Sequence, residues 1–181
     1  MRARSFVLGG LAAVVLAAAS VTGIALATSA GQPTHSQTSL ACSPPTLPGQ
    51  QVTVVLGDMG AMMNGGMMGG SMMLHVTPQS VPAGTVSFIA LNHGTVTHEL
   101  VVLPLASGAS VGTRAVGTDN RVSEDGSVGE ASADCGSGAG EGIAPGHASW
   151  VTLALKPGRY EVLCNLPGHY AAGMYAELDV T

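Results

Sequence analysis

Arg159-Tyr-Glu-Val-Leu-Cys-Asn-Leu-Pro-Gly-His-Tyr-Ala-Ala-Gly-Met-Tyr-Ala-Glu-Leu-Asp-Val-Thr181 closes the chain, and the rest of the sequence is interpreted from this stretch. Two strand-like segments flank a short loop in which Cys164, His169 and Met174 follow a C-x4-H-x4-M spacing. A thiolate, an imidazole and a thioether on one loop form a donor set that suits copper. One further ligand is needed, and it must come from elsewhere in the chain.

His98 is the preferred source of the missing ligand. It lies 66 residues before Cys164, at the start of the predicted strand Thr97-His-Glu-Leu-Val-Val-Leu-Pro104. His93, in a turn-forming sequence, is the competing histidine, but the chain after His98 continues into an apolar run typical of a buried strand. We therefore expect two imidazoles, one thiolate and a weak axial thioether around one copper ion. The predicted metal ligands are His98, Cys164, His169 and Met174.

Short apolar or alternating segments, separated by Gly and Pro turns, predict a fold built from strands. Helical periodicity is almost absent outside the N-terminal segment. Seven to eight short strands indicate an all-β, antiparallel β-sandwich with Greek-key connections. The predicted strands cover 51–56, 72–77, 85–92, 97–104, 149–155, 159–164 and 174–180.

The segment Cys164-Asn-Leu-Pro-Gly-His-Tyr-Ala-Ala-Gly-Met174 resembles the copper loop of the cupredoxin, or type 1 blue copper, family. Its spacing is similar to that in rusticyanin, sulfocyanin and auracyanin, and Thr97-His-Glu-Leu-Val-Val102 resembles the strand that carries the family's first ligand. The resemblance covers about 51–181 and implies one-electron transfer by Cu(II)/Cu(I) cycling. Glu99 departs from the pattern, because plastocyanin and azurin carry there an Asn that braces the copper loop.

The expected function is therefore electron transport to or from a redox partner protein by a monomer that does not bind nucleic acid. We expect His169 near the surface, ringed by Pro167, Tyr170, Ala171 and Ala172, where that partner would dock. An enzyme resembling copper oxidases would need further copper sites, and no His-x-His pair is present in the sequence. The protein is accordingly predicted not to be an enzyme.

The N-terminal thirty residues predict export. Met1-Arg-Ala-Arg4 precedes an apolar run that ends near small residues at 25–30, as in a secretory signal peptide. The run approaches membrane-spanning length, so an uncleaved N-terminal anchor is the alternative. Either way the domain at 51–181, after a Pro-rich linker at 31–50, is expected to work outside the cytoplasm.

A loop rich in methionine and glycine is predicted at 57–73, which holds seven Met and six Gly. Thioethers bind Cu(I), so an alternative function is copper storage, delivery or resistance through this loop. The competing interpretation is that the flexible methionines only cover an apolar surface.

A second long connection, 106–146, is rich in Gly, Ser and carboxylates. Its length indicates a functional, partly structured or disulfide-tied segment. Without the first thirty residues the chain has four cationic side chains against eleven carboxylates, a formal charge of −7, which argues against nucleic-acid binding. Cys42 and Cys135 are free to pair, but their spacing does not decide whether they do.

Overall fold

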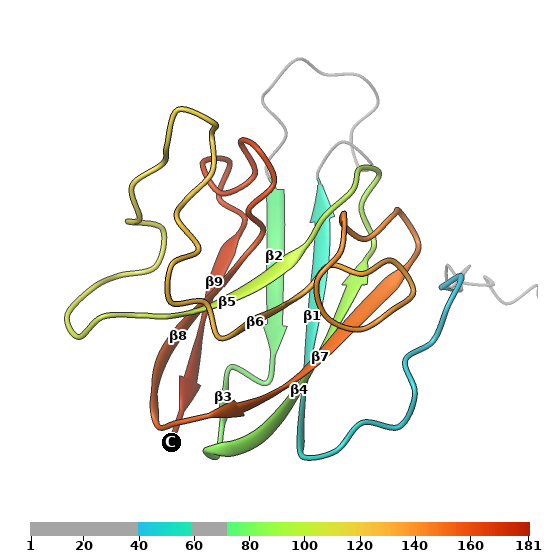
Figure 1. Cartoon of the computed structure of the whole chain (residues 1–181), viewed down its shortest axis with the longest axis horizontal. Helices are drawn as coiled ribbons and strands as arrows, with labels where there is room; N and C mark the ends of the chain where they lie inside the picture. Colours follow the sequence, from blue (N-terminus) through green and yellow to red (C-terminus); the bar gives the residue numbers. More distant parts are fainter. Residues whose placement is uncertain (1–39, 59–71) are drawn as a thin grey trace, which may run out of the picture. The chain divides into compact units, whose positions relative to one another are not determined.

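The computed structural model describes residues 40–58 and 72–181, and its strands form two sheets (Figure 1). The four-stranded sheet has the order β2-β1-β4-β7, and the five-stranded sheet has the order β3-β9-β8-β5-β6. The strands are β1 (Gln50–Asp58), β2 (Met72–Thr77), β3 (Ser80–Val81), β4 (Gly84–Asn92), β5 (Leu100–Pro104), β6 (Gly129–Ala131), β7 (Ala148–Leu155), β8 (Gly158–Leu163) and β9 (Tyr175–Val180).

Alternating apolar residues place the core between the two sheets. Val52, Val54 and Leu56 of β1 are fully buried, and Phe88 of β4 lies beside them. Leu178 of β9 belongs to the same buried cluster from the other sheet. Successive side chains of a strand point to opposite faces, so this period of two gives each sheet one apolar face to bury. The predicted all-β sandwich is confirmed.

Both sheets are mixed, whereas the sequence suggested antiparallel pairing throughout. β1 pairs with β4 in parallel, and β3 pairs with β9 in parallel; the other pairs are antiparallel. Alternation in a sequence reports which face is buried but not the direction of a neighbouring strand. The strands β3 and β6 have only two and three residues, too few to show an alternating pattern in the sequence. With them, the described ranges contain nine strands.

The Met/Gly-rich loop predicted at 57–73 lies only partly within the described residues. Gly57 and Asp58 belong to β1, while Met72 and Met73 belong to β2, so the predicted Met/Gly-rich loop is shorter than 57–73. Its remaining residues, 59–71, lie outside the described residues, as does the predicted signal or anchor segment at 1–30. Within the described ranges, no helix combines the length and the hydrophobicity needed to cross a bilayer.

The connection at 106–146 is partly structured and is tied by a disulfide bond. It contains β6, and Cys135 within it is bonded to Cys42 of the leading segment across a sequence separation of 93. The Cys135 amide also donates a hydrogen bond to the Ala148 carbonyl at the start of β7. The disulfide that the sequence left open is thus formed, and it fixes the leading segment to the second half of the domain.

Replacing both bonded cysteines, Cys42→Ser with Cys135→Ser, is expected to lower the free energy of unfolding by about 2–4 kcal/mol, because a crosslink between distant residues restricts the unfolded chain. Denaturant titration of the double variant against the wild type measures this loss. Thr46→Ala, an exposed change in the same leading segment, serves as the control and should leave stability within about 0.5 kcal/mol. Equal stability of the double variant and the wild type would contradict the prediction.

Candidate metal centre

A turn after β4 and a bridge to Ile143 hold His98. The buried side chain of Asn92 donates to the Val96 and Ile143 carbonyls, at 2.8 and 2.7 Å, and accepts from the Gly94 amide at 2.8 Å. His98 and Ile143 then exchange two backbone hydrogen bonds, of 3.2 and 2.7 Å. His98 therefore lies in an isolated bridge just before β5, and its side chain is fully buried.

The β8–β9 connection supplies the other predicted ligands. Gly168 and Gly173 have φ angles of +86° and +94°, so the bends beside His169 and Met174 use the left-handed region that favours glycine. The Met174 carbonyl accepts from the Cys164 amide, and the Met174 amide donates to the His169 carbonyl, both at 3.1 Å. The backbone thus closes the loop on itself and keeps the three residues together. In Figure 1 this connection and the β4–β5 connection lie at the same end of the sheets.

Three of the predicted ligands converge on one point. The ligand atoms of His98, Cys164 and His169 lie within 4.8 Å of one another. The two Nδ1 atoms are 3.3 Å apart, and Cys164 Sγ lies 3.3 Å from His169 Nδ1. Metal–nitrogen bonds of about 2.0 Å would place two ligands of a trigonal metal about 3.5 Å apart. The spacing of the donors therefore fits one metal ion.

The fourth predicted ligand, Met174, is fully buried in the same apolar cluster as Cys164. Leu166 packs against this cluster. Two imidazoles, a buried thiolate and a thioether are the donors of a type 1 copper site, whereas structural zinc is held by cysteine and histidine without a thioether. The donor set fits one type 1 copper ion.

Burial leaves the metal-free site without charge. It lowers the pKa of His98 to about 4, where the neighbouring His169 acts in the same direction and Asp58 opposes it. It raises the pKa of the Cys164 thiol to about 12, against hydrogen bonds from the Leu166 and Glu99 amides. Two neutral imidazoles and a protonated thiol therefore face one another at neutral pH. A bound cation would favour the thiolate over the thiol, because the metal replaces the thiol proton and offsets the free-energy cost of desolvating the thiolate.

Glu99 takes over the bracing of the predicted copper loop. Its amide donates to Cys164 Sγ at 3.4 Å, and its Oε1 atom accepts from the Asn165 amide at 3.0 Å. The side chain of Asn165 in turn bonds both the amide and the carbonyl of Val122 and reaches Glu124. The glutamate that departs from the plastocyanin and azurin pattern thus still links the two ligand-bearing segments. No pattern in the sequence indicated that Asn165 takes part in bracing the loop.

The segment 112–124 lies along the predicted copper loop. The Gly168 amide donates to the Asn120 carbonyl, and the Tyr170 hydroxyl accepts from the Arg114 amide. Tyr170 also donates to the fully buried carboxylate of Glu161 at 3.0 Å, so it points inward and is only 2% exposed. The expectation that Tyr170 belongs to a surface ring around His169 is therefore wrong. Pro167, Ala171 and Ala172 are exposed as expected.

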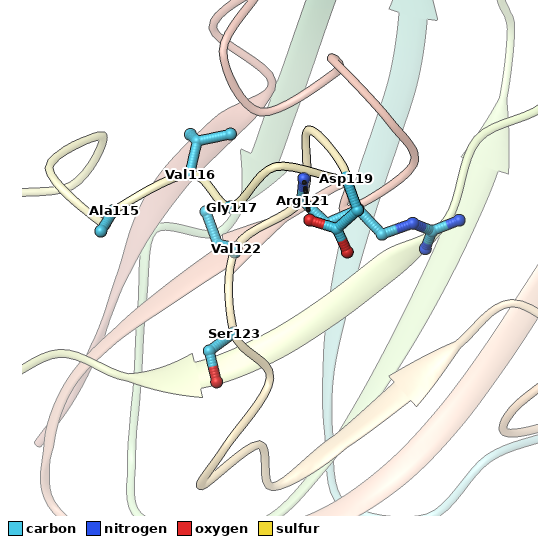
Figure 2. A pocket seen from close by; sticks show the side chains of 7 residues that line it. All are labelled: Ala115, Val116, Gly117, Asp119, Arg121, Val122 and Ser123. Carbon is cyan, nitrogen blue, oxygen red and sulfur yellow. Dashed lines mark hydrogen bonds between the residues drawn. The ribbon is translucent and has the colours of Figure 1, made fainter.

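A pocket of about 320 Å³ opens within this segment (Figure 2). Figure 2 shows Asp119 and Arg121 side by side at its rim, joined by a hydrogen bond from the Arg121 amide to Asp119 Oδ1. None of its lining residues is a predicted ligand; they are Ala115, Val116, Gly117, Asp119, Arg121, Val122 and Ser123.

The remaining histidines of the described residues do not belong to the donor cluster. His93, the competing candidate, and His75 are exposed. The Nδ1 atom of His147 lies 2.8 Å from an Asp134 carboxylate oxygen. The methionines at 59–68 lie outside the described residues, so a Cu(I) site there stays a prediction.

An all-β sandwich that buries two imidazoles, a thiol and a thioether at one end belongs to the class of blue copper proteins, the cupredoxins. Within that class, a family model described as the sulfocyanin (SoxE) domain matches residues 52–181. The chain belongs to the sulfocyanin family. No curated protein sequence matches it at a significant level.

The chain is also similar to solved structures of auracyanins and rusticyanin. Auracyanin B is 22% identical, with 79% of this chain and 96% of that protein covered and a TM-score of 0.46. Auracyanin from Roseiflexus castenholzii is 22% identical, covering 74% and 99%, with a TM-score of 0.44. Rusticyanin from Thiobacillus ferrooxidans is 20% identical, covering 78% and 87%, with a TM-score of 0.43. The family assignment rests on the family model.

A pH-dependent stability effect is expected from Glu99, whose pKa burial and the nearby Glu124 raise to about 7 against the opposing charge of Arg121. Since this folded-state pKa lies above the unfolded value, Glu99 favours folding at low pH and loses that contribution as pH rises from about 4.5 through 7. Glu99→Gln mimics the protonated form. Metal-free Glu99→Gln should match the wild type at pH 5 and exceed it by roughly 1–3 kcal/mol at pH 8.

Thermal or denaturant unfolding of the metal-free proteins at several pH values measures this difference. Glu141→Gln, at an exposed carboxylate, is the control and should show no such trend. A stability difference for Glu99→Gln that stays constant from pH 5 to pH 8 would contradict the assignment of the buried charge.

Proposed function

We propose that this protein is an exported blue copper protein that carries single electrons, with His98, Cys164, His169 and Met174 as the ligands of one type 1 copper ion. The observation that carries the proposal is the convergence of three donor atoms within 4.8 Å of one another, where His98 Nδ1 and Cys164 Sγ each lie 3.3 Å from His169 Nδ1. A bound copper ion would cycle between Cu(II) and Cu(I) and so transfer one electron at a time.

In this function, the polypeptide fixes the positions of the donor atoms. His98, Cys164 and Met174 are each 0% exposed, and their backbones are hydrogen-bonded to Ile143 or to one another. Packed apolar surroundings resist rearrangement, so the two oxidation states would share one geometry. Exclusion of water also protects the thiolate from oxidation. These properties suit a carrier that changes charge without changing shape.

Electrons would enter and leave through His169. It is only half-buried, whereas the other three donors are fully buried. The exposed residues around it, Pro167, Ala171 and Ala172, are small and uncharged. Such a surface gives a partner protein a short approach to the imidazole, and we assign the docking of a redox partner to it. Tyr170 supports this surface from inside through its hydrogen bond to Glu161.

The proposed setting is outside the cytoplasm, with the protein released or tethered through its N-terminus. The Cys42–Cys135 disulfide supports it, since disulfide bonds persist in oxidising compartments. A carrier is preferred to an enzyme, because the second metal-compatible cluster in the described residues, Cys42, Cys135 and His147, is closed by that disulfide.

The proposal predicts a blue or green protein. Addition of Cu(II) to the soluble domain should give an intense thiolate-to-copper absorption band and the EPR spectrum of a type 1 site. Cys164→Ser should abolish the band, because a serine hydroxyl stays protonated and cannot replace the thiolate. Copper binding without this band in the wild type would contradict the proposed site.

The docking surface is tested with Ala171→Glu. Docking of a partner would bury the new carboxylate beside His169. This should slow electron transfer to a natural partner about tenfold or more, while the absorption spectrum stays the same. Stopped-flow kinetics measures the rate. Ser110→Glu, on the 106–146 connection, is the control and should leave the rate unchanged. Equal rates for the wild type and Ala171→Glu would exclude this surface as the docking site.

A further inference from the structure

The carboxylate of Asp58, the last residue of β1, organises the turn that precedes His98. Its Oδ2 atom accepts from the Thr95 amide at 2.5 Å and from the Val96 amide at 3.3 Å, and its Oδ1 atom accepts from the Thr95 hydroxyl at 2.8 Å. Burial by itself would raise the pKa of Asp58, but these hydrogen bonds outweigh it and the pKa lies below its ordinary value. The side chain is 7% exposed, so an anion is held just beneath the surface.

His98 presents its second ring nitrogen to this anion. Its Nε2 atom is buried without a hydrogen-bond partner and lies 3.6 Å from Asp58 Oδ2. The Nδ1 atom on the other side of the ring faces His169. If Nδ1 binds a metal, the ring proton must sit on Nε2, and a buried N–H without an acceptor is unfavourable. Asp58 Oδ2 is the oxygen placed to accept a hydrogen bond from that N–H, after a movement of less than about 1 Å.

The close approach of these groups needs a glycine at position 94. A Cβ atom there would lie 2.8 Å from His98 Nε2 and closer still to the Asp58 carboxylate, with the Asn92 amide oxygen at 3.2 Å. A side chain at 94 would therefore have to push the aspartate and the histidine apart. The turn, the glycine and the aspartate form one arrangement around the outer edge of the His98 ring.

From this geometry we infer that Asp58 is a positioning residue of the metal centre, which fixes the His98 ring by accepting a hydrogen bond from Nε2–H and stabilises the oxidised metal electrostatically. The inference rests on the proposed copper function. Metal-bound imidazoles commonly donate their second N–H to a carboxylate, which raises the basicity of the ligand. Cu(II) carries one charge more than Cu(I), so a fixed anion stabilises the oxidised state more and lowers the reduction potential.

Asp58→Asn tests the inference, because it keeps the shape of the side chain and removes its charge. The ratio of Cu(II) to Cu(I) affinity should fall about tenfold, which raises the midpoint potential by about 59 mV for a one-electron couple. Protein-film voltammetry on the copper-loaded domain measures the potential, and competition with a Cu(II) chelator gives the affinity. The type 1 absorption band should persist.

Thr95→Val is the matched control. It removes the hydroxyl donor to Asp58 Oδ1 but leaves the carboxylate charge in place, so it should lower stability while moving the Cu(II)/Cu(I) affinity ratio less than twofold. An unchanged potential in Asp58→Asn, or an equal shift in Thr95→Val, would overturn the inference and leave Asp58 as a cap of the turn. A wild-type domain without a type 1 spectrum would instead overturn the proposed function.

Discussion

The register between β5 and β8 is the constraint on which the donor cluster depends. Val101 faces Leu163 in this antiparallel pair, and the same register continued by two residues sets Glu99 against Asn165. The hydrogen bonds of Glu99 to Cys164 Sγ and to the Asn165 amide follow from it. A slip by one residue would turn every side chain to the opposite face of the sheet. His98 and Cys164 could not then point to the same site, even with the sequence of the loop unchanged.

The apolar interior that fixes the donors also determines what they can hold. A site lined by neutral imidazoles and a protonated thiol is stable when empty, and it favours a cation that releases the thiol proton. Water would weaken that preference by solvating each group separately. The metal centre is therefore built from the same apolar packing as the core, with Cys164 and Met174 as members of the main cluster.

Local patterns predicted the fold class and the four proposed ligands, because alternation marks buried faces and three of the ligands lie within eleven residues of one another. Features created by pairing between distant segments gave no such signal. The short strand β6 exists because Leu100 pairs with Ala131, and the parallel β1–β4 pair brings Asp58 beside the turn that leads to His98. Tyr170 was predicted at the surface because it neighbours His169, but a hydrogen bond to Glu161 directs it inward.

The cystine between Cys42 and Cys135 also decides where mechanical load enters the domain. Its Cys42 Sγ atom lies against the backbone of Ala148, where β7 begins. A pull on any part of the protein that precedes Cys42 is passed through a covalent bond to the 129–146 region and β7. Tension is thereby shared between the backbone that continues into β1 and the disulfide that leads toward β7. The domain is therefore loaded at two points of the four-stranded sheet, where β1 begins and where β7 begins, and not at a single strand.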